Sequence, residues 1–325
     1  MTNKKFLLLE NNYMAFHTLQ DVEELETVSI FHRKKVSNNK IINLLFNIHN
    51  SGKIEKYVTL PFRSIWDNIL FKNVIKDLSP DYIVFTTSWY SEHLIKYFRC
   101  NSSKSKLILQ FSDMVTKELG DKYDSLIEKL PKQFDGILVY SQEDADEYGF
   151  TYHSIGYSPV KKELLQPKKQ YDVVFVGADK GRINKIREAY NKFTAAGLSC
   201  FFYVILVKEE DRLDDGIIYA DNVMDFDEYL SYEVSANCLF EIVQEGSSGR
   251  TYRMMESIIY NKPLITNCKE ILDTQYYRPE YVQLYNDVSE IDPSFVNSQS
   301  QPVNFHYKGD FSPIRDLEFI ENNWE

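Results

Sequence analysis

The sequence predicts an α/β protein of two doubly wound units, each a parallel sheet with helices on both faces. Short apolar segments rich in Val, Ile, Phe and Tyr alternate with amphipathic segments of helical period along the chain. Strands of a parallel sheet have this near-continuous apolar character because helices cover both of their faces. The 325 residues are enough for two such units of roughly 150 residues each.

Six strands are predicted in the first half of the chain, at residues 6–10, 27–32, 56–60, 82–87, 106–111 and 136–141. Residues 62–78 and 88–98 have amphipathic patterns and are predicted to be helices. Ser79-Pro80 is expected to end the first helix, and Ser88 to cap the second. These elements predict a Rossmann-like domain over residues 1–158.

A polar segment with two prolines separates the two halves and predicts a hinge at residues 159–170. The second domain is predicted over residues 171–310. Its predicted strands span 171–177, 200–207, 216–221, 238–243, 263–266 and 281–285, and its predicted helices span 182–196, 226–235 and 250–260. Residues 311–325 are expected to end the chain as a helix with Pro313 in its first turn.

The composition excludes several classes of protein. A formal charge of -11 argues against binding to nucleic acid, which needs a basic face. No apolar run approaches the roughly 18 residues of a membrane-spanning helix, and residues 1–10 pass from lysines straight into a strand-length stretch. We therefore expect a cytoplasmic protein. Cysteines and histidines have no metal-ligand spacing, so no metal site is predicted.

Ligands of doubly wound sheets bind beyond the carboxyl ends of the strands, so the loops there are the first candidates for a site. In the loop after residues 171–177, Gly177 allows a tight turn, and Lys180 with Arg182 offers positive charge to a diphosphate. The alternative interpretation is a solvated turn that leads into a basic helix.

Residues 241–256 form a second candidate, a strand followed by a glycine and serine turn and a helix. Glu256 is placed to accept both hydroxyls of a ribose; the alternative is a surface pair with Arg253 worth about 0.5 kcal/mol. Residues 261–267 form a third loop that ends in Thr266 and Asn267. The other candidate contacts to a ligand are Gln244, Glu245, Ser247, Ser248, Gly249, Arg250 and Thr251.

Residues 238–285 carry four motifs in sequence: Glu241-x-x-Gln244, Gly249-Arg-Thr-x-Arg-x-x-Glu256, 261–267 as NKPLITN, and Tyr276-Tyr277-x-Pro279. This stretch resembles the C-terminal domain of bacterial glycosyltransferases of capsule, lipopolysaccharide and exopolysaccharide biosynthesis. Residues 140–149 and 171–177 also fit that pattern. The resemblance covers about residues 139–285; before that, only the architecture agrees.

The resemblance implies the GT-B fold, in which two Rossmann-like domains face each other across a cleft. It implies a metal-independent, hexosyltransferase-type enzyme without a cofactor, whose substrate is a UDP- or GDP-linked sugar. The first domain would face the acceptor, a glycan or lipid-linked glycan. Glu256 would hold the ribose, and Lys180 with Arg182 the diphosphate. Many retaining relatives have a second Glu where this chain has Ser248, so inversion and retention both stay open.

An inverting enzyme needs a general base from the first domain. Asp113 and Glu10 follow predicted strands there, and His17 is a more distant candidate; each has the alternative of a helix cap or a solvated loop group. Two other functions stay open, a sugar-nucleotide epimerase and a non-catalytic nucleotide-sugar-binding module. A lipid-linked acceptor implies peripheral association with the inner membrane face. The basic residues 32–35 and apolar residues 66–71 are candidates for it, but a solvated loop and a core helix are the favoured interpretation of these two segments.

Overall fold

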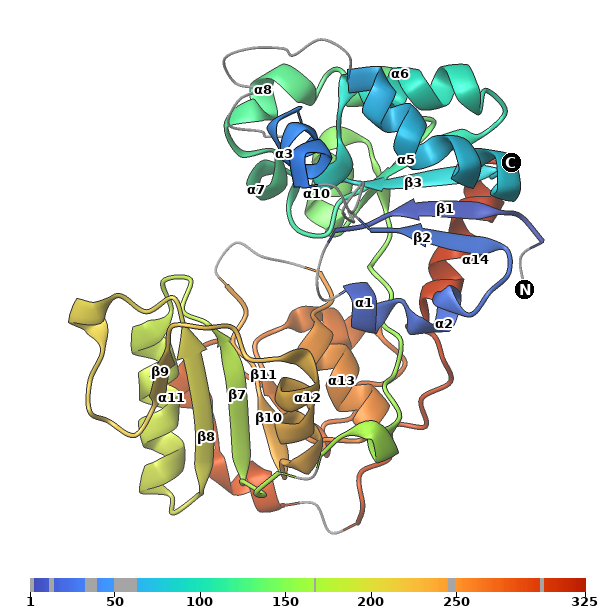
Figure 1. Ribbon diagram of the computed structural model, residues 1–325. Helices are drawn as coiled ribbons and strands as arrows, with labels where there is room; N and C mark the ends of the chain where they lie inside the picture. The colour runs from blue at the N-terminus through green and yellow to red at the C-terminus, as the bar shows by residue number, and fades with distance from the viewer. Residues whose placement is uncertain are drawn as a thin grey trace. The chain divides into compact units, whose positions relative to one another are not determined.

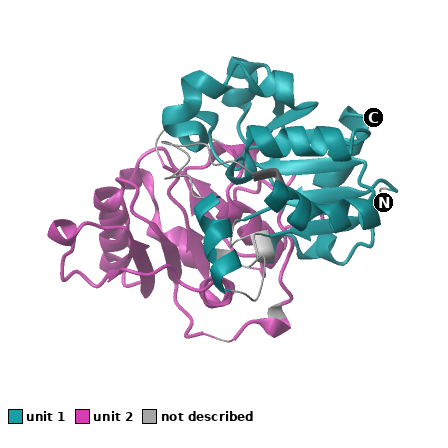
Figure 2. Cartoon of the chain, turned by 45° about the horizontal axis from the view of Figure 1, so that its top comes forward, with its two compact units in different colours: residues 1–156, 313–325 teal, residues 157–312 magenta. Residues whose placement is uncertain are grey.

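The computed structural model describes residues 3–11, 15–32, 40–49, 63–166, 168–244, 249–298 and 301–325. The chain divides into two compact units (Figure 2). Unit 1 is Met1–Gly156 with Pro313–Glu325, and unit 2 is Tyr157–Ser312. The division falls after Gly156, a little before the hinge predicted at 159–170, and the C-terminal helix belongs to unit 1.

Unit 1 is built on a six-stranded parallel sheet in the order β2-β1-β3-β4-β5-β6 (Figure 1). Its strands are β1 (Phe6–Leu9), β2 (Val28–Phe31), β3 (Tyr82–Thr86), β4 (Lys106–Gln110), β5 (Gly136–Val139) and β6 (Thr151–Tyr152). All of these strands except β6 were predicted. β6 was missed because a two-residue strand has no measurable period. The strand predicted at 56–60 lies outside the described residues.

The helices of unit 1 are α1 (Ala15–Thr18), α2 (Gln20–Glu23), α3 (Lys40–His49), α5 (Arg63–Leu78), α6 (Glu92–Asn101), α7 (Val115–Leu119), α8 (Tyr123–Leu126), α9 (Leu130–Gln133), α10 (Gln142–Tyr148) and α14 (Pro313–Asn323). The expected cap at Ser88 is wrong. The Ser88 hydroxyl lies 2.9 Å from that of Thr86 in a short 3-10 turn, and α6 begins only after Ser91. No helix within the described ranges is long and apolar enough to cross a bilayer.

Alternate residues of β1 face opposite sides of the sheet, and both sides are buried. Leu7 and Leu9 belong to one apolar cluster, with Phe85 and Phe98, whereas Phe6 belongs to the cluster on the other side. This explains why the strand is apolar at every position. The predicted burial of both faces is thus confirmed for unit 1.

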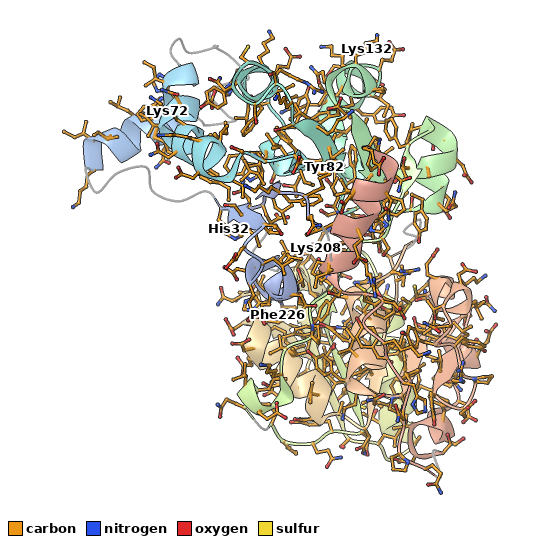
Figure 3. All side chains as sticks on the ribbon, turned by 90° about the vertical axis from the view of Figure 1, so that its right-hand side faces the viewer. His32, Lys72, Tyr82, Lys132, Lys208 and Phe226 are labelled. Atoms are coloured by element: carbon orange, nitrogen blue, oxygen red, sulfur yellow. The ribbon has the colours of Figure 1, made fainter. Side chains whose placement is uncertain are left out.

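The C-terminal helix α14 packs against the second of these clusters through Leu317 and Ile320. Near its end the Tyr82 hydroxyl donates to the Trp324 carbonyl oxygen at 2.9 Å, and Figure 3 shows Tyr82 beside this helix. Both carboxylate oxygens of Asp316 are used: Oδ1 lies 2.9 Å from His153 Nε2, and Oδ2 accepts the Gly156 N–H at 2.9 Å. Asp316 therefore fastens the helix to the end of the first chain segment.

Replacement of Asp316 by alanine should lower the free energy of unfolding by about 2–4 kcal/mol, because two bonds to a largely buried carboxylate are lost. The matched control is Glu318→Ala on the same helix, whose exposed pair with Arg315 should contribute less than about 0.5 kcal/mol. Urea denaturation followed by circular dichroism measures both. Equal losses for the two variants would show that Asp316 does not fasten the helix.

Unit 2 contains a second six-stranded parallel sheet, in the order β12-β11-β10-β7-β8-β9. Its strands are β7 (Val173–Ala178), β8 (Cys200–Ile205), β9 (Ile218–Ala220), β10 (Cys238–Phe240), β11 (Leu264–Thr266) and β12 (Val282–Leu284). All six coincide with predicted strands, each within a few residues. The predicted α/β class with two doubly wound parallel sheets is confirmed.

Three helices flank this sheet: α11 (Ile183–Ala195), α12 (Phe226–Ser235) and α13 (Tyr252–Tyr260). The buried face of α11 packs on one side of the sheet, in a cluster with Phe175, Phe202 and Phe240. Phe201 points to the other side, where it stacks on Tyr232 of α12 with ring centroids 3.9 Å apart. The sheet is covered on both faces, so the polar groups that follow its strands meet at its carboxyl edge.

Candidate functional site

The order of strands in unit 2 reverses between β7 and β10. From β7 the chain moves outward through β8 and β9, then returns to β10 and continues through β11 and β12. The loops after β7 and β10 therefore leave the carboxyl edge in opposite directions. In doubly wound sheets a ligand crevice forms at such a switch point.

A pocket of about 550 Å³ lies at this edge. Its walls come from the segments that follow β7, β10, β11 and β12, so four of the six strands contribute to it. The lining residues are Lys180, Gly181, Arg182, Asn184, Lys185, Ile242, Val243, Gln244, Asn267, Tyr285, Asn286, Asp287 and Val288. We call it the switch-point pocket.

A tight turn joins β7 to α11 at the mouth of this pocket. Lys180 and Gly181 both have positive φ, 45° and 80°, and Lys180 is exposed. A non-glycine residue in this region is uncommon and is typical of functional turns. Asp179 follows β7 directly, and its Oδ1 accepts the Ile183 N–H at 2.6 Å. The amino end of α11, a 13-residue helix, is thereby fixed at the pocket, where its dipole favours an anion.

Arg182 is held in the pocket wall by backbone carbonyl groups. Its guanidinium donates to Ala178 O at 2.6 Å, to Asp179 O at 3.0 Å and to Ile242 O. A guanidinium has five N–H groups, so two are left to donate to a ligand. Burial, with Arg253 nearby, lowers the pKa of Arg182, but an arginine keeps its charge at neutral pH. Arg182 therefore joins the ends of β7 and β10 and offers a fixed positive charge.

The charge of the pocket walls is predominantly positive. Lys180 and Lys185 are exposed beside Arg182, whereas Asp287 is the single carboxylate among the lining residues. The side chain and backbone of Ser289 donate to Asp287 and lower its pKa, so it stays ionised. Amide side chains of Asn184, Gln244, Asn267 and Asn286 complete the polar lining. Three cations, one carboxylate and several amides suit an anionic ligand that also carries hydrogen-bonding groups.

Behind the pocket, Glu241 ties the ends of β10 and β11 together. Its carboxylate accepts the Thr251 hydroxyl at 2.5 Å and the Thr266 hydroxyl at 2.6 Å, and burial raises the pKa of Glu241. Asn267 Oδ1 accepts the Val243 N–H at 2.6 Å. Thr266 is completely buried and Thr251 caps α13, so both support the site, whereas Asn267 lines it.

A second buried network involves Glu256. Its side chain is 0% exposed; Oε1 accepts the Tyr157 hydroxyl at 2.8 Å and Oε2 accepts the Tyr229 hydroxyl. Burial, with the Glu233 carboxylate beside it, raises the pKa of Glu256 well above its usual range. Arg253 is fixed by an ion pair with Glu233 at 2.7 Å, and it also donates to the Val176 carbonyl oxygen.

This network corrects the ribose assignment. A carboxylate enclosed by two tyrosines, with no exposed surface, offers no hydroxyl acceptor to a ligand, so Glu256 has a structural role in this conformation. The expected surface pair of Arg253 and Glu256 is also wrong, because Arg253 pairs with Glu233 in the interior. Residues 253 and 256 do lie on one helix, as predicted. Spacing within that helix, however, does not reveal which side chains from α12 and from residue 157 pack against it.

No protein-family model matches the chain, and no curated protein matches its sequence. Solved structures do match along nearly its whole length. Sucrose-phosphate synthase from Thermosynechococcus elongatus gives a TM-score of 0.53 at 10% identity, over 98% of this chain and 99% of that one. Alr3699/HepE from Anabaena, in complex with UDP, gives 0.52 at 10% identity, over 98% and 100%. The N-terminal domain of Candida albicans trehalose-6-phosphate phosphatase gives 0.52 at 9% identity, over 99% and 97%.

The chain has the GT-B fold. At identities near 10% the likeness establishes the fold alone, and the residues of the site carry any argument about activity.

Several predicted donor contacts lie elsewhere in this GT-B chain. Gly177 belongs to β7, and the turn occurs three residues later at Lys180 and Gly181. Arg250 lies over the Phe311 ring at 5.8 Å, and Gly249 is buried with a φ of 100°. Among the described residues, these positions are not part of the pocket lining. Glu245, Ser247 and Ser248 lie outside the described residues.

The two candidate bases both lie at the carboxyl edge of the unit 1 sheet. Glu10 follows β1, and its Oε1 accepts the Asn11 N–H at 2.7 Å. Asp113 follows β4, accepts the Met114 N–H at 2.8 Å and has a 40% exposed side chain. The sequence missed Glu118, which accepts the N–H groups of Ser112 and Asp113 and the Thr87 hydroxyl. Burial raises the pKa of Glu118.

The sequence analysis also missed part of the switch-point pocket, namely Asn184, Lys185, Asn286 and Asp287. The strand at 281–285 was predicted, and the rule that ligands lie beyond carboxyl ends applies equally to the residues after it. That signal was available for Asn286 and Asp287. Across the described ranges, no group of three or more His, Cys, Asp or Glu residues is arranged to hold a metal ion; metal independence stays a prediction.

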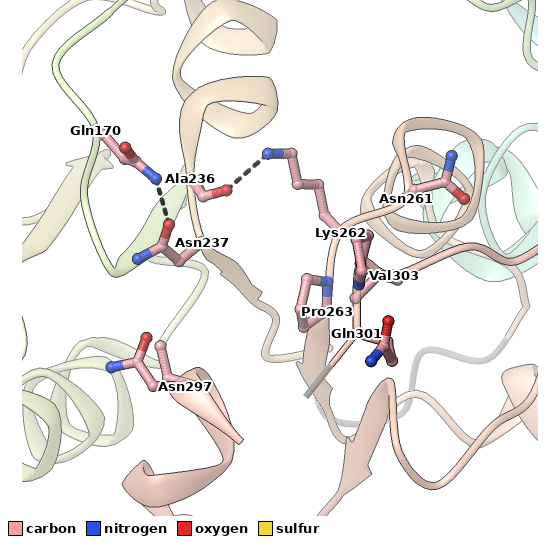
Figure 4. A pocket seen from close by; sticks show the side chains of 11 residues that line it. Gln170, Ala236, Asn237, Asn261, Lys262, Pro263, Asn297, Gln301 and Val303 are labelled. Carbon is pink, nitrogen blue, oxygen red and sulfur yellow. Dashed lines mark hydrogen bonds between the residues drawn. The ribbon is translucent and has the colours of Figure 1, made fainter. Parts of the chain in front are cut away.

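A smaller pocket of about 360 Å³ lies at the opposite edge of the unit 2 sheet (Figure 4). It is lined by residues that precede β10 and β11, including Asn237 and Pro263. Two of its amides bond to each other, since Gln170 donates to Asn237, and Lys262 Nζ donates to the Ala236 carbonyl oxygen at 2.8 Å. Because ligands of doubly wound sheets bind at carboxyl edges, the switch-point pocket is the candidate site.

Proposed function

We propose that this chain is a glycosyltransferase whose nucleotide-sugar donor binds in the switch-point pocket. The observation that carries the proposal is the meeting of Lys180, Arg182 and Lys185 at the amino end of α11, inside a pocket formed by the ends of four strands. A nucleoside diphosphate matches this chemistry, because its phosphates need fixed cations and helix N–H groups while its base needs hydrogen-bonding partners. The UDP bound to the similar HepE structure supports a nucleotide of this kind.

The amides in the pocket wall are the proposed partners of the base and sugar. Gln244 and Asn267 follow β10 and β11, while Asn184 lies in the first turn of α11. Each amide offers donors and an acceptor, which suits the edge of a pyrimidine or purine. We propose that the donor is a UDP- or GDP-linked sugar and that the transferred group is a hexosyl group.

The finer parts of the proposal concern the acceptor and the reaction. We infer a growing cell-surface polysaccharide or a lipid-linked oligosaccharide as the acceptor, on the cytoplasmic side of the membrane. Asp113 or Glu10 would act as the general base if the reaction inverts the anomeric centre. Lys180, Arg182 and Lys185 would stabilise the charge of the leaving diphosphate. This stabilisation should contribute more to catalysis than the general base does.

Removal of two lysines tests the donor site. The double variant Lys180→Ala/Lys185→Ala should weaken binding of UDP or GDP by at least about tenfold, because each lost charge-assisted bond contributes about 1.5–3 kcal/mol when fully formed. The matched control is Lys208→Ala/Lys269→Ala, two exposed lysines of unit 2 outside the pocket lining. Isothermal titration calorimetry gives both affinities. Undiminished affinity in the pocket variant would remove the donor site from the proposal.

Product analysis separates transfer from the two alternative functions. Incubation with a panel of UDP- and GDP-sugars and no acceptor should give only slow hydrolysis if the chain is a transferase. Rapid conversion of one nucleotide-sugar into its epimer would favour the epimerase. Tight binding of a nucleotide-sugar without turnover, even with cell-envelope glycans added, would favour the non-catalytic module.

A further inference from the structure

The smaller pocket, at the opposite edge of the unit 2 sheet, has a wall rich in amide side chains. Five of its eleven lining residues are asparagine or glutamine, and none of the described residues that line it is a carboxylate. We call it the amino-edge pocket, because Asn237 and Pro263 come directly before β10 and β11. Its volume of about 360 Å³ lies within the range of ligand pockets, roughly 300–1,000 Å³.

Hydrogen bonds fix part of this amide wall. Asn237 Nδ2 donates to Asp172 Oδ1 at 2.9 Å, and Asn237 Oδ1 accepts from Gln170 Nε2. Asn261 Oδ1 accepts the Phe305 N–H at 2.9 Å. These bonds leave Gln170 Oε1 and Asn261 Nδ2 without a partner among the described residues. The wall is therefore ordered and still offers an acceptor and a donor to a ligand.

Asn297 and Gln301 supply the exposed part of the wall. Neither side chain bonds to another residue in the part of the chain that the structure describes. Figure 4 shows Asn237 and Asn297 on one side of the pocket and Lys262 and Gln301 on the other. Each amide carries two N–H donors and an acceptor oxygen, so a ligand can donate and accept on both sides.

The ends of two helices make this pocket unfavourable for an anion. Helices α12 and α13 both end here, since their C-cap residues, Ala236 and Asn261, line the pocket. The carboxyl end of a helix carries partial negative charge. The Asp172 carboxylate lies behind Asn237 and adds to it. The amino-edge pocket is thus the electrostatic opposite of the switch-point pocket, where a helix begins.

A cation is disfavoured as well. Lys262 is the single charged residue among the lining residues, and its Nζ donates to the Ala236 carbonyl oxygen at 2.8 Å. A lysine in this position compensates the carboxyl end of α12. It also repels a second positive charge in the pocket. The chemistry that remains is a neutral ligand with many hydrogen-bonding groups.

We propose that the amino-edge pocket binds a segment of a neutral glycan. Sugar hydroxyl groups donate and accept, so two neighbouring hydroxyls can bond to the oxygen and the nitrogen of one amide. Buried Pro263 and Val296 add apolar surface for the C–H groups of a sugar ring. The choice of a glycan over another neutral polyol rests on the proposed transferase function. The site would hold a part of a long acceptor that is not being extended.

Ligand-detected NMR on the full chain tests the proposal with four neutral disaccharides, namely maltose, cellobiose, lactose and N,N′-diacetylchitobiose. At least one should bind, and titration gives its affinity. The variant Asn297→Ala/Gln301→Ala should weaken that binding by at least about tenfold, because it removes two amides that bond to the sugar. Thermal melts should be unchanged, since both side chains are exposed.

The matched control is Gln166→Ala/Asn322→Ala, which removes two exposed amides outside the pocket lining and should bind the disaccharide as the wild type does. Binding of none of the four disaccharides would overturn the proposal. Binding that Asn297→Ala/Gln301→Ala leaves unchanged would do the same. A phosphate ion whose binding this variant weakens would show an anion site instead.

Titration of UDP and GDP on the same samples separates this proposal from the donor site. Asn297→Ala/Gln301→Ala should keep the nucleotide affinity of the wild type, because neither residue lines the switch-point pocket. Nucleotide binding without any disaccharide binding would remove the glycan site and leave the donor site in place. Disaccharide binding that depends on the two amides, without nucleotide binding, would do the reverse.

Discussion

Replacement of Arg182 by leucine should weaken binding of UDP or GDP by at least about a hundredfold. Two N–H groups of this guanidinium are left for a phosphate after it has donated to three carbonyl oxygens, those of Ala178, Asp179 and Ile242. Two charge-assisted bonds of about 1.5–3 kcal/mol each account for that loss. The three carbonyl contacts also fix the loops after β7 and β10, so the free energy of unfolding should fall as well.

Arg187 provides the matched control for this prediction. It lies on the same helix, donates to Asp215 at 2.8 Å, and is not among the pocket residues. Arg187→Leu should therefore lower stability but leave nucleotide affinity as in the wild type. Calorimetry and urea denaturation on both variants separate the two effects. If Arg182→Leu lost stability yet bound nucleotide normally, the switch-point pocket would not be the phosphate site.

Replacement of Glu256 by glutamine should stabilise the protein at neutral pH, and the gain should grow as pH rises. The raised pKa of Glu256, caused first by burial and then by Glu233, means that the folded state keeps a proton that the unfolded state releases near pH ~4.3. Wild-type stability is therefore greatest below that pH and falls as pH rises toward the folded pKa. One proton corresponds to about 1.4 kcal/mol per pH unit. Glutamine does not titrate, so it removes this slope.

The geometry of the network supports the same sign. Glu233 Oε2 is buried and has no hydrogen-bond donor among the described residues while Glu256 is ionised. A proton on Glu256 supplies one, because the two carboxyl groups are neighbours. Urea denaturation between about pH 5 and 8 tests the prediction. Glu228→Gln, an exposed carboxylate on α12 paired with Lys168, is the control and should leave the wild-type profile unchanged. Parallel pH profiles for Glu256→Gln and wild type would contradict the assignment.

Strands and long helices were predictable because local sequence carries their periods. The segment 226–235 was predicted as a helix and is one, and 106–111 differs from β4 by a single residue. Short elements were not predictable in this way. The four-residue helices α8 and α9 have too few residues to establish a period, and they depend on contacts with the rest of unit 1.

For the candidate site, the edge of the sheet could be predicted from the sequence, but not every residue. Lys180, Arg182, Gln244 and Asn267 were chosen because they follow strands, and all four line the switch-point pocket. Position after a strand predicts where a residue lies along the sheet axis. It does not predict whether the side chain turns outward, as Lys180 does, or inward to tie strands together, as Thr266 does.

The sequence by itself determined the α/β class, the two parallel sheets and the edge at which the candidate site lies, because alternating apolar periods and chain direction define these features locally. Only the tertiary structure decided the role of Glu256. Tyr157 and Tyr229 lie 99 and 27 residues away along the chain, and it is their hydroxyls that enclose its carboxylate. The burial of a side chain and its hydrogen-bond partners depend on such distant contacts. For this reason a helical motif that is typical of a ligand site forms part of the interior here.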